Sequence, residues 1–108
     1  SLERAVENYM VNYIAELEAP KKADIEARAE EAMATSYYKT LLSAFETEML
    51  QREVRREARL SKKLAGIVAK DETERAEIEK SLRELDKKGD EAIYGLRLKD
   101  HLNQVVLE

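Results

Sequence analysis

The chain has 108 residues, a formal net charge of −4 and no cysteine, which excludes disulfides and thiolate metal sites. Ala, Glu, Lys, Leu and Arg account for 64 of the 108 residues, a share above the roughly 50% that is typical of long helices and coiled coils. Three glycines and one proline are too few to supply the turns of a sheet, so a protein built on strands is excluded as well.

Residues 2–18 form the first predicted helix. Their apolar side chains recur at spacings of three and four, which places them on one broad face of a helix. They are Leu2, Val6, Tyr9, Met10, Tyr13, Ile14 and Leu17. Pro20 ends this helix, because proline disfavours a helical conformation in the residue before it and suits the first turn of the next helix.

Residues 21–69 are predicted to form one long helix, because no glycine or proline occurs between Lys21 and Ala65. Apolar residues recur at spacings of four, and a second series follows them. The first series is Ile25, Ala29, Met33, Tyr37, Leu41, Phe45 and Met49, and the second is Leu50, Val54, Ala58, Ala65 and Val68. The local sign of a break is Thr35-Ser36, where either hydroxyl could cap a new helix, but no Glu or Gln follows three residues later. We therefore expect a single helix, bent at most near residue 36.

Two further helices are predicted over residues 72–88 and 91–107. The long helix ends at Gly66 or at the Lys70-Asp71 step, and the acidic residues from Asp71 onward lie at the positive end of the next helix dipole. Two lysines, Gly89 and an aspartate then follow in sequence, which is the usual order of residues where one helix ends and the next begins. A continuous helix through Gly89 also fits the sequence. The apolar residues of the first of these helices are Ile78, Leu82 and Leu85, and those expected to face inward from the second are Ile93, Leu96, Leu102 and Val106.

These elements predict an all-α fold: an elongated antiparallel helical hairpin or bundle of three to four helices in a single domain, residues 1–108. Folding about residue 70 sets positions whose numbers sum to about 141 opposite each other, and residues 2–18 fold back on residues 21–37. A rod of this kind covers its apolar faces only in part. We therefore expect a homo-oligomer, a complex with a protein partner, or both.

The tyrosines suggest where a partner would dock. Five tyrosines occur beside one phenylalanine and no tryptophan, and aromatic rings with polar tips are enriched at interfaces. Packing within the core or along a dimer seam is the simpler interpretation, and a ligand pocket is a third. The predicted interface residues are Tyr9, Tyr13, Leu17, Tyr37, Leu41 and Phe45.

Residues 51–63 carry six basic side chains among thirteen residues. A basic stripe along one helix face arises because four of them recur at spacings of four, three and four: Arg52, Arg56, Arg59 and Lys63. Such a stripe can follow the phosphates of a nucleic acid or an acidic partner surface. The hairpin register also places Glu84 near Arg56 and Glu77 near Lys63, so ion pairs within the chain are the favoured interpretation.

Catalytic and metal-binding arrangements are not indicated. The single histidine, His101, has Leu98 three residues before it where a di-iron helical bundle needs a glutamate. Without cysteine, a second histidine or a glycine-rich loop, the usual nucleophilic and phosphate-binding sites cannot be assembled. We therefore expect no enzyme activity, no metal and no cofactor, and we interpret His101 as an ordinary residue near a helix terminus.

The leading functional hypothesis is a non-enzymatic interaction, assembly or scaffold protein that docks a partner or itself through apolar helix faces. A nucleic-acid-associated protein that uses residues 52–63 is the second hypothesis, and a bundle that binds a small molecule among its tyrosines is the third. No apolar run is long enough to span a membrane, so we expect a cytoplasmic protein with no membrane partner.

Overall fold

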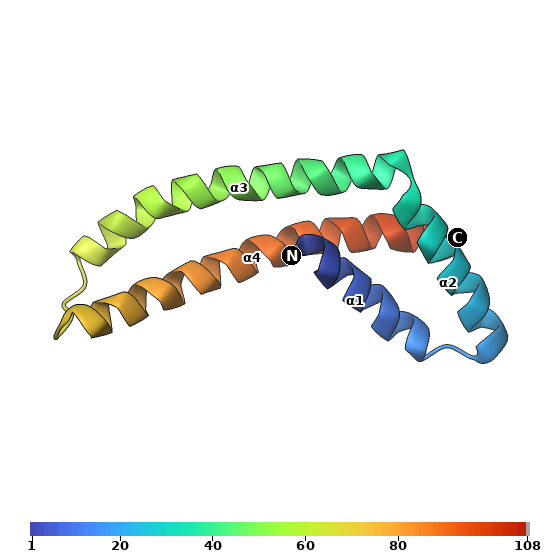
Figure 1. The fold of residues 1–108 in the computed structure, drawn as a ribbon, viewed down its shortest axis with the longest axis horizontal. Helices are drawn as coiled ribbons and strands as arrows, with labels where there is room; N and C mark the ends of the chain where they lie inside the picture. The colour runs from blue at the N-terminus through green and yellow to red at the C-terminus, as the bar shows by residue number, and fades with distance from the viewer. Residues whose placement is uncertain (108) are drawn as a thin grey trace.

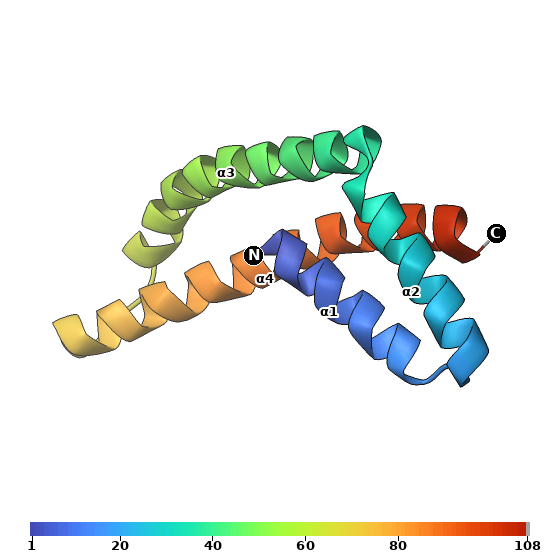
Figure 2. The ribbon, with the colours of Figure 1, turned by 45° about the vertical axis from the view of Figure 1, so that its right-hand side comes forward.

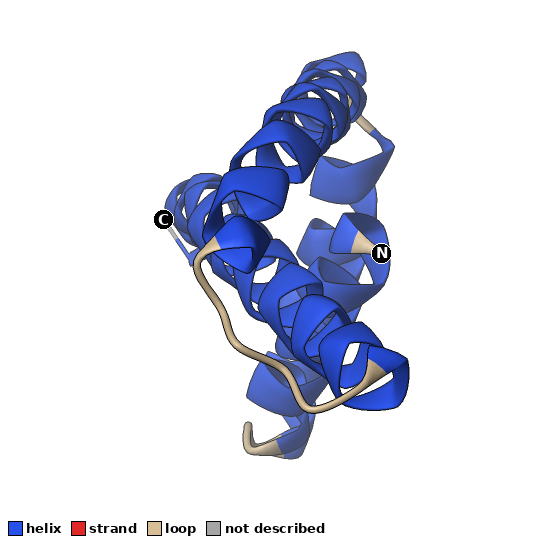
Figure 3. Cartoon of the chain, turned by 90° about the vertical axis from the view of Figure 1, so that its left-hand side faces the viewer, coloured by secondary structure: helices blue, strands red, loops and turns tan. Residues whose placement is uncertain are grey.

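The computed structural model describes residues 1–107, and Glu108, which the predicted domain includes, lies outside them. The fold is all-α, as expected, and residues 1–107 contain no strand (Figure 3). The four helices are α1 (Leu2–Ala15), α2 (Ala19–Ala34), α3 (Ser36–Ala65) and α4 (Glu72–Leu107), as Figure 1 shows.

The first helix closely follows its prediction. Ser1 caps α1 by accepting a hydrogen bond from the Arg4 amide, and the buried face consists of Leu2, Val6, Met10 and Ile14. The helix ends at Ala15, three residues earlier than predicted. Pro20 lies in the first turn of α2, where its missing amide hydrogen costs no helical hydrogen bond.

The prediction of one helix over residues 21–69 is wrong, because the chain breaks at Thr35. Thr35 adopts an extended conformation, with φ −67° and ψ 148°, and ends α2 while it caps α3. Its side-chain oxygen accepts a hydrogen bond from the Tyr38 amide at 3.2 Å, and its hydroxyl donates to the Ala32 carbonyl at 2.7 Å. One threonine thus serves both helix ends without the Glu or Gln of a capping box.

The division at Gly89 is also absent, and α4 runs unbroken through it. The start of α4 is as predicted: the Asp71 carboxylate accepts from the Glu74 amide at 2.9 Å, and the Glu74 carboxylate accepts from the Lys70 amide at 2.9 Å. The preceding helix, α3, ends at Ala65, with Gly66 as its C-cap. The long helix of this protein is therefore α4, with 36 residues, rather than residues 21–69.

The four helices form an antiparallel hairpin with two arms at one end. Helices α3 and α4 run side by side in opposite directions, and α1 and α2 form a V against the C-terminal half of α4 (Figures 1 and 2). The core lies where all four helices meet. Its α4 residues recur at spacings of four and are almost fully buried: Tyr94, Leu98, Leu102 and Val106.

Several apolar residues face solvent rather than the core, against expectation. Ile93 and Leu96 are exposed, because the core phase of α4 follows Tyr94 and Leu98 instead. On α3, the second predicted apolar series does not form the buried face, since Leu50 and Val54 are exposed. The residues that face inward there are Arg56, Leu60 and Leu64. Leu85 is exposed as well.

The molecule is elongated, as predicted, with principal extents of 59 × 27 × 16 Å. Away from the core, the N-terminal half of α4 lies beside α3 alone (Figures 1 and 2). Among residues 1–107, no helix has the length and apolar character needed to cross a bilayer.

Candidate functional site

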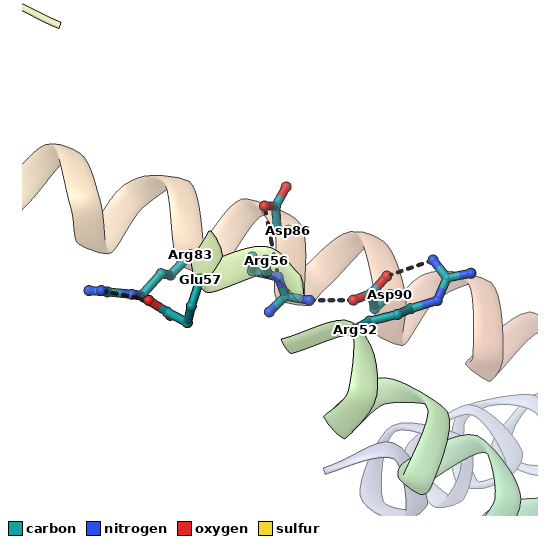
Figure 4. A network of polar contacts seen from close by, with 6 residues as sticks. All are labelled: Arg52, Arg56, Glu57, Arg83, Asp86 and Asp90. Atoms are coloured by element: carbon teal, nitrogen blue, oxygen red, sulfur yellow. Dashed lines mark hydrogen bonds and ion pairs between the residues drawn. The ribbon is translucent and has the colours of Figure 1, made fainter. Parts of the chain in front are cut away.

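A buried arginine on α3 contacts two carboxylates of α4 (Figure 4). Arg56 on α3 is only 5% exposed, and its guanidinium donates a hydrogen bond to the Asp90 carboxylate of α4. Its Nε also lies 3.8 Å from the Asp86 carboxylate. Arg52, one turn earlier on α3, reaches the other oxygen of Asp90 at 3.4 Å. A buried guanidinium requires such partners, because an unpaired charge away from water is costly.

A second ion pair joins the same two helices nearer the turn. Arg83 on α4 donates two hydrogen bonds to the Glu57 carboxylate, at 2.8 and 3.0 Å (Figure 4). These bonds hold the pKa of the Glu57 carboxyl below its usual range, and the same contact raises the pKa of Arg83. Because both side chains are about half exposed, solvent screens the pair and it adds little stability.

Only part of the predicted basic stripe forms ion pairs within the molecule. The pairs Arg56–Asp86 and Glu57–Arg83 match the register predicted for the hairpin. The partner of Arg56 is not Glu84, however, and residues 1–107 show no ion pair between Lys63 and Glu77. The N-terminal half of the stripe is thus used inside the molecule, and Arg59 and Lys63 remain exposed.

Tyr94 extends the Arg52 network into the core. The guanidinium carbons of Arg52 and Arg97 lie 5.5 and 5.6 Å from the centroid of its ring, and the Phe45 ring lies 5.3 Å away. A hydrogen bond with the Glu48 carboxylate, followed by burial, raises the pKa of Tyr94. The Tyr94 ring thus links the charged layer of the hairpin to its apolar core.

The predicted partner interface is mostly used within the chain. Of its six residues, those that pack partly buried against the core are Tyr9, Tyr13, Leu17, Leu41 and Phe45. The Asn103 amide of α4 donates a hydrogen bond to the Tyr9 hydroxyl at 3.1 Å. Tyr37 is 61% exposed, because the break at Thr35 turns Tyr38 inward in its place, and its ring lies 4.9 Å from that of His101.

A different apolar surface remains free on α4. We call it the outer α4 face, and its residues are Leu85, Gly89, Ala92, Ile93 and Leu96. Leu85 is 66% exposed and Leu96 is 60% exposed. The sequence did not predict this face, because Ile93 and Leu96 were expected in the core and Leu85 was assigned to a separate helix that ended before Gly89. The signal that identifies it is a second periodicity: Leu82, Leu85, Gly89, Ala92 and Leu96 follow steps of three and four, whereas the core residues of α4 follow steps of four.

Other exposed large apolar side chains lie singly or in pairs elsewhere. Leu50 and Val54 form one pair on α3, and Val68 lies in the turn before α4. Scattered residues of this kind are normal on protein surfaces, whereas a stripe along one helix is not.

Metal binding finds no support in residues 1–107, where no group of three His, Cys, Asp or Glu side chains is arranged to hold an ion. His101 contacts Tyr37 and is partly buried near the end of α4. No protein-family model matches this chain, and neither the curated proteins nor the solved structures compared with it include a significant match.

Proposed function

We propose that this chain is a non-enzymatic helical assembly protein in which the outer α4 face pairs with the same face of a second copy. The observation that carries the proposal is the exposed stripe of Leu85, Ile93 and Leu96 on a half-covered helix. Exposed stripes of this kind usually mark an interaction surface.

The spacing of the stripe favours a helix as the partner. Alternating steps of three and four are the pattern that packs against another helix as knobs into holes. Gly89 and Ala92 lie at its centre, where their small side chains let the axis of a second helix approach closely. An added Cβ at Gly89 would meet no atom within 4 Å, so this surface is open within the chain itself.

A second copy is the simplest source of that helix. Two identical stripes can cover each other across a two-fold axis, which is the commonest symmetry of soluble oligomers. Few charges interrupt the stripe, since the charged residues Asp86 and Lys88 lie at its margins rather than within it.

The experiment is a measurement of mass by light scattering at about 10 μM, with helicity followed by circular dichroism. We expect twice the mass of the chain, and a monomer of unchanged helicity for the double variant Leu85→Glu/Leu96→Glu. The matched control is Leu50→Glu/Val54→Glu, because these side chains are 63% and 75% exposed but lie on α3. A monomeric wild type, or an equal loss of mass in the control, would refute the proposal.

Nucleic-acid binding is the second candidate, and the exposed basic residues at the far end of α3 favour it. Arg55, Arg59, Lys62 and Lys63 have no ion pair within residues 1–107. If they contact phosphates, the affinity for duplex DNA should fall with salt with a log-log slope of roughly −4 for four neutralised phosphates. The double variant Arg59→Gln/Lys63→Gln should then reduce that slope by about half. We expect no binding in about 150 mM salt, because this group is small and the chain as a whole is acidic.

A further inference from the structure

The turn between α3 and α4 presents an apolar side chain to water. Val68 is 97% exposed, the highest value among the large apolar residues that face solvent in residues 1–107. Ile67 and Ala69 on either side of it are partly exposed. A single exposed valine is common on protein surfaces, so its surroundings decide whether it has a role.

The surroundings of Val68 are basic. We call residues 62–70 the hairpin tip, which contains three lysines and no acidic residue: Lys62, Lys63 and Lys70. All three are exposed, and none has an ion pair within residues 1–107. The nearby carboxylates of Asp71 and Glu74 accept hydrogen bonds from backbone amides at the start of α4. The tip thus combines an exposed apolar side chain with a surplus of positive charge.

A groove between α1 and α2 has the complementary character. Its volume is about 390 Å³, and its apolar lining includes Met33 and Val11, which is 64% exposed. The charged residues that line it are three glutamates and one lysine: Glu7, Glu26, Glu30 and Lys22. None of these glutamates forms an ion pair within residues 1–107. The α1–α2 groove is therefore apolar at its floor and acidic at its margins.

The tip cannot reach the groove of its own chain. The two surfaces lie at opposite ends of a molecule that is 59 Å long (Figures 1 and 2). An exposed apolar side chain and a pocket elsewhere on the same molecule form a heterologous contact between copies, and such a contact repeats from one copy to the next. Contacts between two tips or between two grooves would instead bring like charges together.

We propose that the hairpin tip of one copy docks in the α1–α2 groove of another copy. Val68 enters the groove and packs against Val11 and Met33, which removes apolar surface of both copies from water. The lysines of the tip then lie near the glutamates at the margins of the groove, and this charge complementarity fixes the orientation of the contact. The contact uses neither Leu85 nor Leu96, so it does not depend on pairing along α4.

The contact is small, so we expect a Kd of roughly 0.1–1 mM and head-to-tail chains whose length rises with concentration. The test is sedimentation equilibrium of the full chain carrying Leu85→Glu/Leu96→Glu, which removes pairing along α4. The protein should be monomeric near 10 μM and exceed the mass of a dimer near 1 mM, and added salt should weaken the association severalfold. A monomeric wild type near 10 μM would refute the pairing along α4 but would leave this test unchanged.

Two variants in the same background identify the surfaces that meet. Val68→Glu alters the tip and Val11→Glu alters the groove, and both should fold because the two side chains are exposed. Each variant alone should stay monomeric near 1 mM. An equal mixture should form a heterodimer that grows no further, because one intact tip and one intact groove remain. With the Val68→Glu copy isotopically labelled, the shifted NMR signals should belong to α1 and α2.

The matched control is Val54→Glu, which places the same charge on α3 at a side chain that is 75% exposed and lies outside both surfaces. This control should still form chains. Association of Val68→Glu or Val11→Glu alone would show that like surfaces meet and would overturn the proposal. So would a mixture that stays monomeric, an equal loss of association in Val54→Glu, or a background protein that remains monomeric near 1 mM.

Discussion

The pairing of Arg56 shows how single side chains set the register of the hairpin. A sliding of α3 along α4 by one turn would leave the buried Arg56 guanidinium with only one of its two carboxylate partners, because Asp86 and Asp90 are themselves one turn apart. Leucine packing alone penalises such a slip less, because one apolar contact can replace another. The ion pair therefore contributes specificity of alignment more than net stability.

Removal of one partner of this pair should destabilise the protein. We expect Arg56→Ala to lower the free energy of unfolding by about 3 kcal/mol, because it leaves a cavity and strands Asp90, which retains only the partly exposed Arg52. The double variant Arg56→Met/Asp90→Leu should recover most of this loss, since it removes both charges. Urea denaturation measures all three proteins. A double variant as unstable as Arg56→Ala would contradict this assignment.

Tyr38 predicts a specific loss of stability in alkali. Burial raises the pKa of Tyr38 to about 12 in the folded chain, above the value near 10 of an unfolded tyrosine, so the folded state holds the proton more tightly. The contribution of this group to the free energy of unfolding is fully present below pH 10. It is lost as the pH rises through 12, which lowers the free energy of unfolding by roughly 1–2 kcal/mol. Comparison with Tyr38→Phe in urea melts isolates the effect, because all other groups are shared. Parallel declines of the two proteins above pH 10 would argue against it.

Helix ends that carry a clear capping or terminating residue could be predicted from the sequence, whereas ends without such a residue could not. Pro20, Gly66 and Asp71 mark helix ends through their own chemistry, and each end lies within a few residues of its prediction. The break at Thr35 has only a weak signature, because no capping box follows Thr35-Ser36 and threonine occurs within helices as well as at caps. Its cause is tertiary: the break lets α2 leave the hairpin and pack across α4 (Figure 1).

The second feature that the sequence did not determine is which face of α4 packs into the core. Tyr94 and Leu98 compete with Ile93 and Leu96 for the inward position, and both sets fit a helical period. The choice depends on which neighbours pack against the helix, and α1 and α2 select Tyr94 and Leu98. The same packing that buries one face leaves the other as the outer α4 face, so a surface formed in this way cannot be inferred from α4 alone.

Gly89 offers a test of the unbroken α4. The residue lies inside the helix, and an added Cβ would meet no atom within 4 Å of the chain. Gly89→Ala should therefore stabilise the monomeric fold by about 0.5–1 kcal/mol, because alanine loses less backbone entropy in a helix. The appropriate measurement is thermal unfolding in the Leu85→Glu/Leu96→Glu background, where dimer contacts do not interfere. Destabilisation by alanine would indicate that α4 is interrupted at this residue.

At the scale of the molecule, the shape explains why apolar surface stays exposed. The radius of gyration is 18.6 Å, whereas a compact chain of this length has about 13 Å. Four helices arranged as a hairpin with two arms concentrate their core at one end, and the other end has only two helices to share (Figure 2). Pairing of two hairpins along α4 would give that thin end additional neighbours.

The most direct test of the proposed pairing is a distance between two copies. Because the chain lacks cysteine, Lys88→Cys places a single nitroxide label at the margin of the outer α4 face, and Ser43→Cys places one on α3 as a control. Helix axes that pack at about 8–10 Å should bring the Lys88→Cys labels within roughly 25 Å of each other in pulsed dipolar spectroscopy, and the Ser43→Cys labels should lie farther apart. Introduction of Leu85→Glu/Leu96→Glu should abolish the dipolar coupling. An absence of coupling at position 88, or a shorter distance at position 43, would contradict the account.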